Sequence, residues 1–180
     1  MFAVGLAASA VAGSEEDGTL ELVAAHPVSR VRVALARFTG LVLLLALLCA
    51  VGTAVLVGLA PRVGLDDGIG AAGFVAAGVG TFALVLVHAA LAFGVGAATG
   101  RRGTAVAAAT VVAAAGFIVQ GLAQVAEPLE PLRAVSPWHW FMDANMLTEG
   151  MALRATVLPL AIAVVFVAAG TAIFARRDLH

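Results

Sequence analysis

Long stretches without a charged residue constrain this chain more than any other feature of its sequence. Four such runs occupy residues 38–60, 68–100, 103–126 and 155–175. A helix needs about 20 apolar residues to cross the roughly 30 Å of hydrocarbon in a bilayer, and each run is long enough. Nothing in the chain alternates in polarity as the strands of a membrane barrel do. We therefore predict an all-α, polytopic membrane bundle that forms a single domain over residues 1–180.

The composition supports this class of protein. Hydrophobic residues make up 62% of the 180 positions and charged residues 12%, and the mean hydropathy is +1.07. Such values are typical of an integral membrane protein. A net charge of −1 argues against a nucleic-acid partner. The single cysteine, Cys49, lies in an apolar run, which excludes an intramolecular disulfide and a cysteine metal site.

Four complete spans are expected, at 38–60, 74–97, 103–126 and 155–175. The second is shorter than its run, because the 33 residues of 68–100 would make about 50 Å of helix. The apolar residues 1–13 make only about 20 Å of helix. We interpret them as a partial span, the inner end of a helix truncated at its start. A signal peptide is the weaker interpretation, since a basic first segment is missing.

Arginine bias sets the expected orientation, because short cytoplasmic loops are enriched in basic residues. If residues 14–37 are cytoplasmic, seven arginines lie inside, and three lie outside: Arg62, Arg133 and Arg154. The C-terminus is then cytoplasmic and residues 127–154 form an external loop. The expected location is a bacterial cytoplasmic membrane, crossed several times.

The segment GSEEDGTLELVAAHPVSRVRVALAR, residues 13–37, is the most polar part of the chain. Ser14 is a candidate helix cap, and the acidic residues after it suit the positive end of a helix. Leu20 and Val23 then share one face, Pro27 ends the helix, and Ser29 is a second candidate cap. The pattern leaves two interpretations open, a short amphipathic helix or a solvated loop.

Two motifs resemble the type-2 permease family of ATP-binding cassette (ABC) transporters. One is SPWHWFMDANMLTEGM together with the terminal FARRDL. The other is an acidic pair, GTLE, a leucine-rich turn, PVSR and a basic run, carried by Glu15, Glu16, Gly18, Thr19, Leu20, Glu21, Leu22, Pro27, Val28, Ser29 and Arg30.

The resemblance implies six spans, a separate ABC ATPase subunit that uses the ATP, and a second permease subunit, identical or related. It also implies that residues 14–37 form a cytoplasmic coupling loop with one short coupling helix. The residues assigned to ATPase coupling are Glu15, Glu16, Gly18, Thr19, Leu20, Glu21, Val23, Pro27 and Arg30.

The external loop contains a second expected short helix. Ser136 is a good cap with Pro137 at the first helical position, and Trp138, Phe141, Met142 and Asn145 recur at helical spacing. Trp138 and Trp140 are suited to the headgroup layer. We expect an interfacial helix that serves as an external gate, as the resemblance suggests, or as an aromatic anchor. The residues assigned to it are Ser136, Pro137, Trp138, Trp140 and Phe141.

Polar residues inside the expected spans are His88, Gln120 and Gln124. They are candidates for a substrate path or for hydrogen bonds between helices. His88 and His139 lie at different expected depths, and the chain has no GxxxxGK[ST] phosphate loop. We therefore expect no enzyme activity, no metal and no bound cofactor. The predicted function is the permease subunit of an ABC exporter; the alternative is a non-transporting membrane scaffold or accessory protein.

Overall fold

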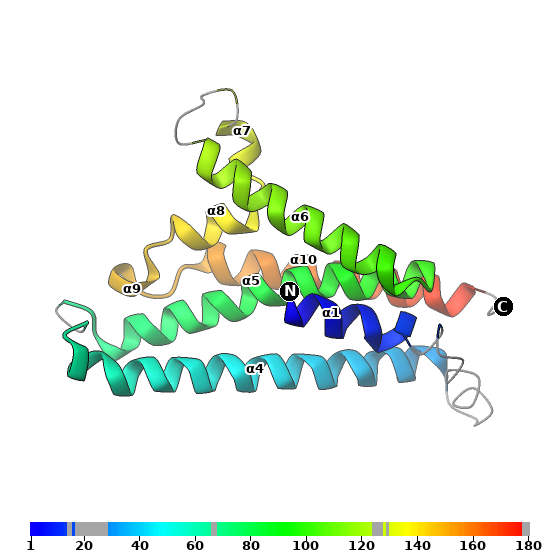
Figure 1. Ribbon diagram of the computed structural model, residues 1–180, viewed down its shortest axis with the longest axis horizontal. Coiled ribbons are helices and arrows are strands. Elements are labelled where there is room, and N and C mark those ends of the chain that lie inside the picture. Colours follow the sequence, from blue (N-terminus) through cyan, green and yellow to red (C-terminus); the bar gives the residue numbers. More distant parts are fainter. Residues whose placement is uncertain (14–15, 17–28, 66–67, 124–127, 129, 178–180) are drawn as a thin grey trace. The chain divides into compact units, whose positions relative to one another are not determined.

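All regular structure in the described part of the chain is helical (Figure 1). The computed structural model describes residues 1–13, 16, 29–65, 68–123, 128 and 130–177. The prediction of an all-α fold is therefore confirmed. The elements are α1 (Phe2–Ala8), η1 (Ser9–Gly13), α4 (Arg30–Val63), α5 (Ala71–Thr99), α6 (Arg102–Leu122), α7 (Glu130–Arg133), α8 (Pro137–Met142), α9 (Met146–Glu149) and α10 (Leu153–Arg176).

Four helices, α4, α5, α6 and α10, are long and apolar enough to cross a membrane. This confirms the four complete spans. Helix α4 has 34 residues and begins at Arg30, well before the charge-free run that starts at Phe38. The arginine, alanine and leucine residues between these points are good helix formers, and the Ser29 hydroxyl accepts a hydrogen bond from the Arg32 N–H at 3.3 Å. The helix therefore starts at its cap and not where the charges end.

Left-handed glycines end two of the long helices. Gly64 has φ of +67°, and the Leu65 N–H after it donates to the Ala60 carbonyl at 3.0 Å. Gly100 also has φ of +67°, and its N–H donates to the Gly96 carbonyl at 2.8 Å. Both patterns satisfy carbonyls that a helix end leaves without partners.

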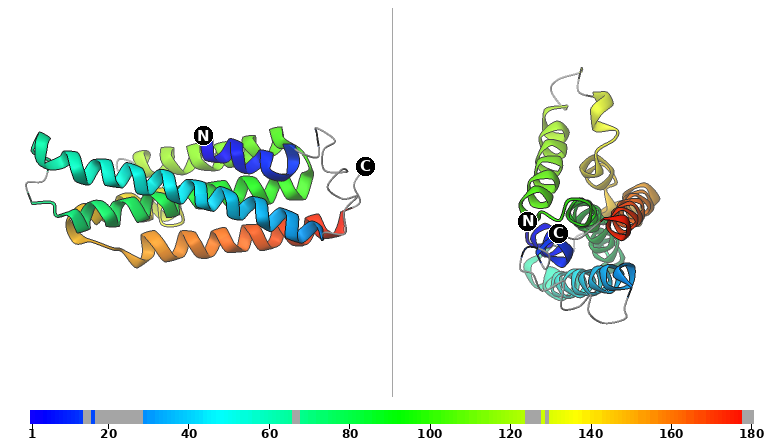
Figure 2. Two further views of the ribbon diagram at one scale, coloured as in Figure 1. Left: turned by 90° about the horizontal axis from the view of Figure 1, so that it is seen from below. Right: turned by 90° about the vertical axis from the view of Figure 1, so that its right-hand side faces the viewer.

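The chain forms two compact units, and each of the four long helices contributes to both. Unit 1 comprises Met1–Leu43, Leu86–Ala113 and Ala161–His180. In it α1 and η1 lie beside α4 and α5 (Figure 2). The rings of Phe38 and Phe93 pack with centroids 4.9 Å apart. Helices α5 and α10 touch through their backbones, because a Cβ on Gly170 would lie 2.6 Å from the Gly94 Cα.

Unit 2 comprises Leu44–Val85 and Ala114–Leu160. Its core contains a small apolar cluster of Ala76, Met146 and Ala155, with Phe141 packed against it. The start of α5 approaches α9 closely, since a Cβ on Gly73 would lie 2.0 Å from the Leu147 carbonyl oxygen. The short helices α8 and α9 are therefore packed on the spanning helices of this unit.

Candidate functional site

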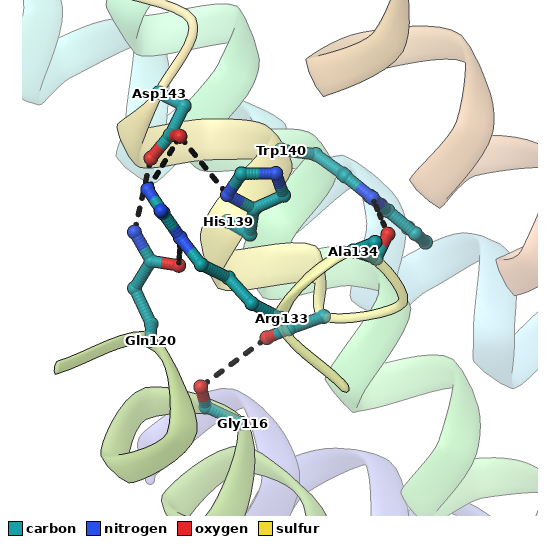
Figure 3. Close-up of polar contacts among 8 residues, drawn as sticks. Gly116, Gln120, Arg133, Ala134, His139, Trp140 and Asp143 are labelled. Atoms are coloured by element: carbon teal, nitrogen blue, oxygen red, sulfur yellow. Dashed lines mark hydrogen bonds and ion pairs between the residues drawn. The ribbon is translucent and has the colours of Figure 1, made fainter. Parts of the chain in front are cut away.

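A network of polar side chains in unit 2 joins the end of α6 to the loop that follows it (Figure 3). We call Gln120, Arg133, His139 and Asp143 the external cluster, after the external loop expected for residues 127–154. Arg133 Nη2 donates to Asp143 Oδ2 at 2.5 Å, and Arg133 Nε donates to Gln120 Oε1 at 3.0 Å. Gln120 Nε2 in turn donates to Asp143 Oδ1 at 3.0 Å. Each of these three side chains therefore bonds both of the others.

The electrostatics of the external cluster keep Asp143 charged. Partial burial would raise the pKa of Asp143, but hydrogen bonds from Arg133 and Gln120, together with the positive charge of Arg133, hold it below its ordinary value. His139 Nδ1 is shielded from solvent and lies 3.1 Å from Asp143 Oδ2, in a contact that lacks hydrogen-bond alignment. Gln120 is only 3% exposed, so its amide depends on these partners.

Helix α8 is fixed to α6 by contacts that replace the expected cap. Ser136 is extended at the N-cap position, yet its hydroxyl donates to the Gly116 carbonyl of α6 at 3.3 Å. The Trp138 ring packs edge-on against Phe117 with centroids 5.2 Å apart. Trp140 is buried, and its Nε1 donates to the Ala134 carbonyl at 2.7 Å (Figure 3).

The helix expected to run on to Asn145 is shorter than the residue spacing indicates. Helix α8 ends at Met142, and Asn145 has φ of +42° as the residue that precedes α9. A left-handed residue interrupts a right-handed helix, so the expected apolar face is divided between two short helices. Phe141 lies in the unit 2 core, whereas Met142 is half exposed.

A second polar group gathers in unit 1, where helix ends meet charged residues. We call Glu16, Arg37, Arg102 and Arg177 the arginine end. Arg37 Nη1 donates to the Ala10 carbonyl of η1 at 2.7 Å, and Arg177 Nη1 donates to the Ala97 carbonyl of α5 at 3.0 Å.

In the third contact of the arginine end, an acidic side chain accepts a hydrogen bond from the N-terminal end of a helix. The first N–H of α6, on Arg102, donates to Glu16 Oε1 at 2.9 Å. Helix ends leave carbonyls and N–H groups without intrahelical partners, and they attract cations at one end and anions at the other. All three contacts follow this rule, and all three join segments far apart in sequence.

The structure describes only some of the residues predicted for ATPase coupling and for a substrate path. Eight lie outside the described residues: Glu15, Gly18, Thr19, Leu20, Glu21, Val23, Pro27 and Gln124. Glu16 is described and bonds α6, and Arg30 is the first residue of α4. His88 is buried in α5 within unit 1, whereas Gln120 belongs to unit 2.

Sequence reasoning missed the pair formed by Arg133 and Asp143. The only signal was two opposite charges ten residues apart in the loop that follows α6, and that spacing matches no helical contact rule. Within the described residues, no three histidine, cysteine or acidic side chains gather as a metal ion would require.

Comparison with known proteins places the chain in a family. A family model described as "ABC-2 family transporter protein" matches residues 1–179. Neither the curated proteins nor the solved structures give a match. The match extends over both motifs that resemble type-2 permeases and over all four spanning helices. The chain therefore belongs to the ABC-2 family of transporter proteins, as a multi-pass membrane permease of ABC transport.

Proposed function

We propose that this chain is the permease subunit of an ABC exporter and that a separate ATPase subunit docks on residues 14–29. Membership of the ABC-2 family and the lack of a phosphate-binding loop in the sequence support a partner that binds and hydrolyses ATP. A second permease subunit, identical or related, completes the transporter. In this proposal the arginine end faces the cytoplasm of a bacterium, where basic residues are enriched.

The observation that carries the proposal is the hydrogen bond between Glu16 and α6. The docking segment continues directly into α4 at Arg30, and Glu16 bonds the first N–H of α6. A displacement of this segment by the ATPase therefore acts on two spanning helices. A ligand or partner shifts a conformation only through contacts that differ between the two states, and these connections supply such contacts.

The bond changes the role expected for Glu16. Glu16 is among the residues assigned to ATPase coupling, but its carboxylate accepts a hydrogen bond from α6 of the same chain. Exposed ion pairs contribute only about 0 to 1 kcal/mol each. We therefore assign the docking free energy to the apolar face of Leu20 and Val23 and an internal positioning role to Glu16.

The test is a matched pair of substitutions in the transporter co-expressed with its ATPase. Leu20→Asp removes the apolar contact and should lower the amount of co-purified ATPase by at least about tenfold. Glu15→Gln removes one exposed charge and should lower it by no more than about fivefold. The proposal fails if Leu20→Asp leaves both the complex and its ATP-dependent activity intact. A stable complex without any ATP-dependent activity would instead favour the scaffold alternative.

A further inference from the structure

An open groove in unit 1 runs along the first turns of α4 and the last turns of α10. Its volume is about 480 Å³, and its lining includes Val31, Leu35 and Phe38 from α4 and Val167, Ala168 and Thr171 from α10. The start of α4 and the end of α10 lie on the same side of unit 1 (Figure 2). The groove therefore lies near this end of both helices.

The lining of the groove offers no free polar group to an occupant. Thr171 is its one polar residue, and the Thr171 hydroxyl donates to the Val167 carbonyl at 2.6 Å. Val31 and Leu35 are 36% and 43% exposed at the rim, whereas Val167 is 8% exposed at the floor. A polar solute would lose its water here without compensation, so the groove suits hydrocarbon.

The lining segment of α4 is long enough to contact part of an extended hydrocarbon chain. Residues 31–38 of α4 cover about 10 Å along the helix axis, which is about two-thirds of one leaflet of hydrocarbon. The Arg37 guanidinium bonds the Ala10 carbonyl within the protein. Arg32, beside the first lining residue, is therefore the arginine of this helix that the proposal uses.

Among the described residues, two arginines lie at this end of the groove. Arg32 lies next to Val31, and Arg176 follows the lining residue Ala172 by one turn. Both arginines are exposed, and neither α4 nor α10 contains an acidic residue. Arginine matches the geometry of a phosphate group, and basic residues at this level attract anionic lipids.

We propose that the groove binds one acyl chain of an anionic glycerophospholipid whose phosphate is held by Arg32 and Arg176. The apolar floor selects the chain, and the two arginines select the charge of the headgroup. At about 1 kcal/mol for each arginine, the preference for an anionic over a zwitterionic headgroup is about thirtyfold at low ionic strength.

The experiment is native mass spectrometry of the purified protein titrated with phosphatidylglycerol and, separately, with phosphatidylcholine. The double variant Arg32→Gln/Arg176→Gln should reduce the preference for phosphatidylglycerol to within about threefold. Ala168→Phe fills the groove from an exposed position and should remove the tightest-bound lipid of either kind. The matched control is Arg62→Gln/Arg154→Gln, which changes the opposite ends of the same two helices and should keep the full preference.

Two results would overturn the proposal. One is an unchanged preference for phosphatidylglycerol in Arg32→Gln/Arg176→Gln when the variant elutes as a single species with wild-type helical content. The other is a loss of dimer mass in Ala168→Phe without loss of lipid, which would show that a second copy of the chain occupies the groove.

Discussion

The hydrogen bond between Glu16 and α6 can be removed by replacing the residue whose backbone N–H donates it. Arg102 is the first residue of α6, where the backbone N–H has no intrahelical partner and proline is well tolerated. Arg102→Pro therefore deletes the donor to Glu16 and keeps the helix. Arg102→Ala deletes the guanidinium but keeps the donor. The difference between these two variants isolates the bond.

The expected magnitude follows from the position of the bond. A side-chain acceptor at a helix N-terminus contributes about 1 kcal/mol, within a range of about 0.5 to 2. Arg102 is exposed and the contact is open to solvent, so the effect belongs in the lower half of that range. One kcal/mol corresponds to about a fivefold change in an equilibrium constant. We therefore expect Arg102→Pro to reduce the population of the conformation in which the docking segment lies against the start of α6 by about two- to fivefold.

The assay is the labelling rate of a cysteine at the exposed position 104, in the first turn of α6. Thr104→Cys is placed in a Cys49→Ala background, and the transporter is labelled with a maleimide with and without ATP. ATP should change the rate in the parent protein and in Arg102→Ala, and this change should be reduced in Arg102→Pro. ATPase co-purification should be equal in all three. An undiminished ATP response in Arg102→Pro would refute the connection between the docking segment and α6.

Three further predictions concern packing, charge and topology. Gly170→Ala should lower the free energy of unfolding by about 1 to 3 kcal/mol, because its Cβ would collide with α5. The control Gly58→Ala, whose Cβ would have nothing within 4 Å, should change the free energy of unfolding by less than about 1 kcal/mol. Melting curves in detergent measure both variants, and equal effects would contradict the close approach of α5 and α10. Arg133→Gln should lower the free energy of unfolding by about 1 to 2 kcal/mol. Because the pKa of Asp143 in the folded protein lies below 3.8, the difference between variant and parent should be constant between pH 7 and 5 and should disappear only as the pH falls through that folded-state pKa. A difference that is already lost at pH 5 would contradict the network. Reporter fusions should place residue 26 in the cytoplasm and residue 143 outside, and an external signal at residue 26 would reverse the proposed orientation.

The spanning helices could be predicted from the sequence because a bilayer selects for length and apolarity. The ends of these helices could not be predicted, because a charge-free run shows which residues can lie in the hydrocarbon of a bilayer and not where the helix begins or ends. Arg37 shows the difference, because it lies inside α4 with its guanidinium on the Ala10 carbonyl. Ser29, the cap before α4, was the better indicator of where that helix begins.

The external cluster could be predicted only in part. Gln120 was identified as a polar residue within an expected span, and as a candidate for a substrate path or for a hydrogen bond between helices. Its partners, Arg133 and Asp143, come from the loop that follows α6 and not from another spanning helix. Loop geometry decides such contacts, and here it depends on the left-handed Asn145 and on the Ser136 contact with Gly116. No local pattern encodes either of these.

The π-helical turn η1 makes the number of residues before Glu16 as important as their identity. A π-turn contains one residue more than an α-turn, and it takes up that residue without rotating the segments on either side. One further residue inserted between Ser9 and Gly13 would instead rotate α1 by about 100° about its axis relative to the following segment. Ala3, Val4 and Ala7, now buried, would leave their packed face. Exchanges among small residues should therefore be tolerated in SAVAG, whereas an insertion should not.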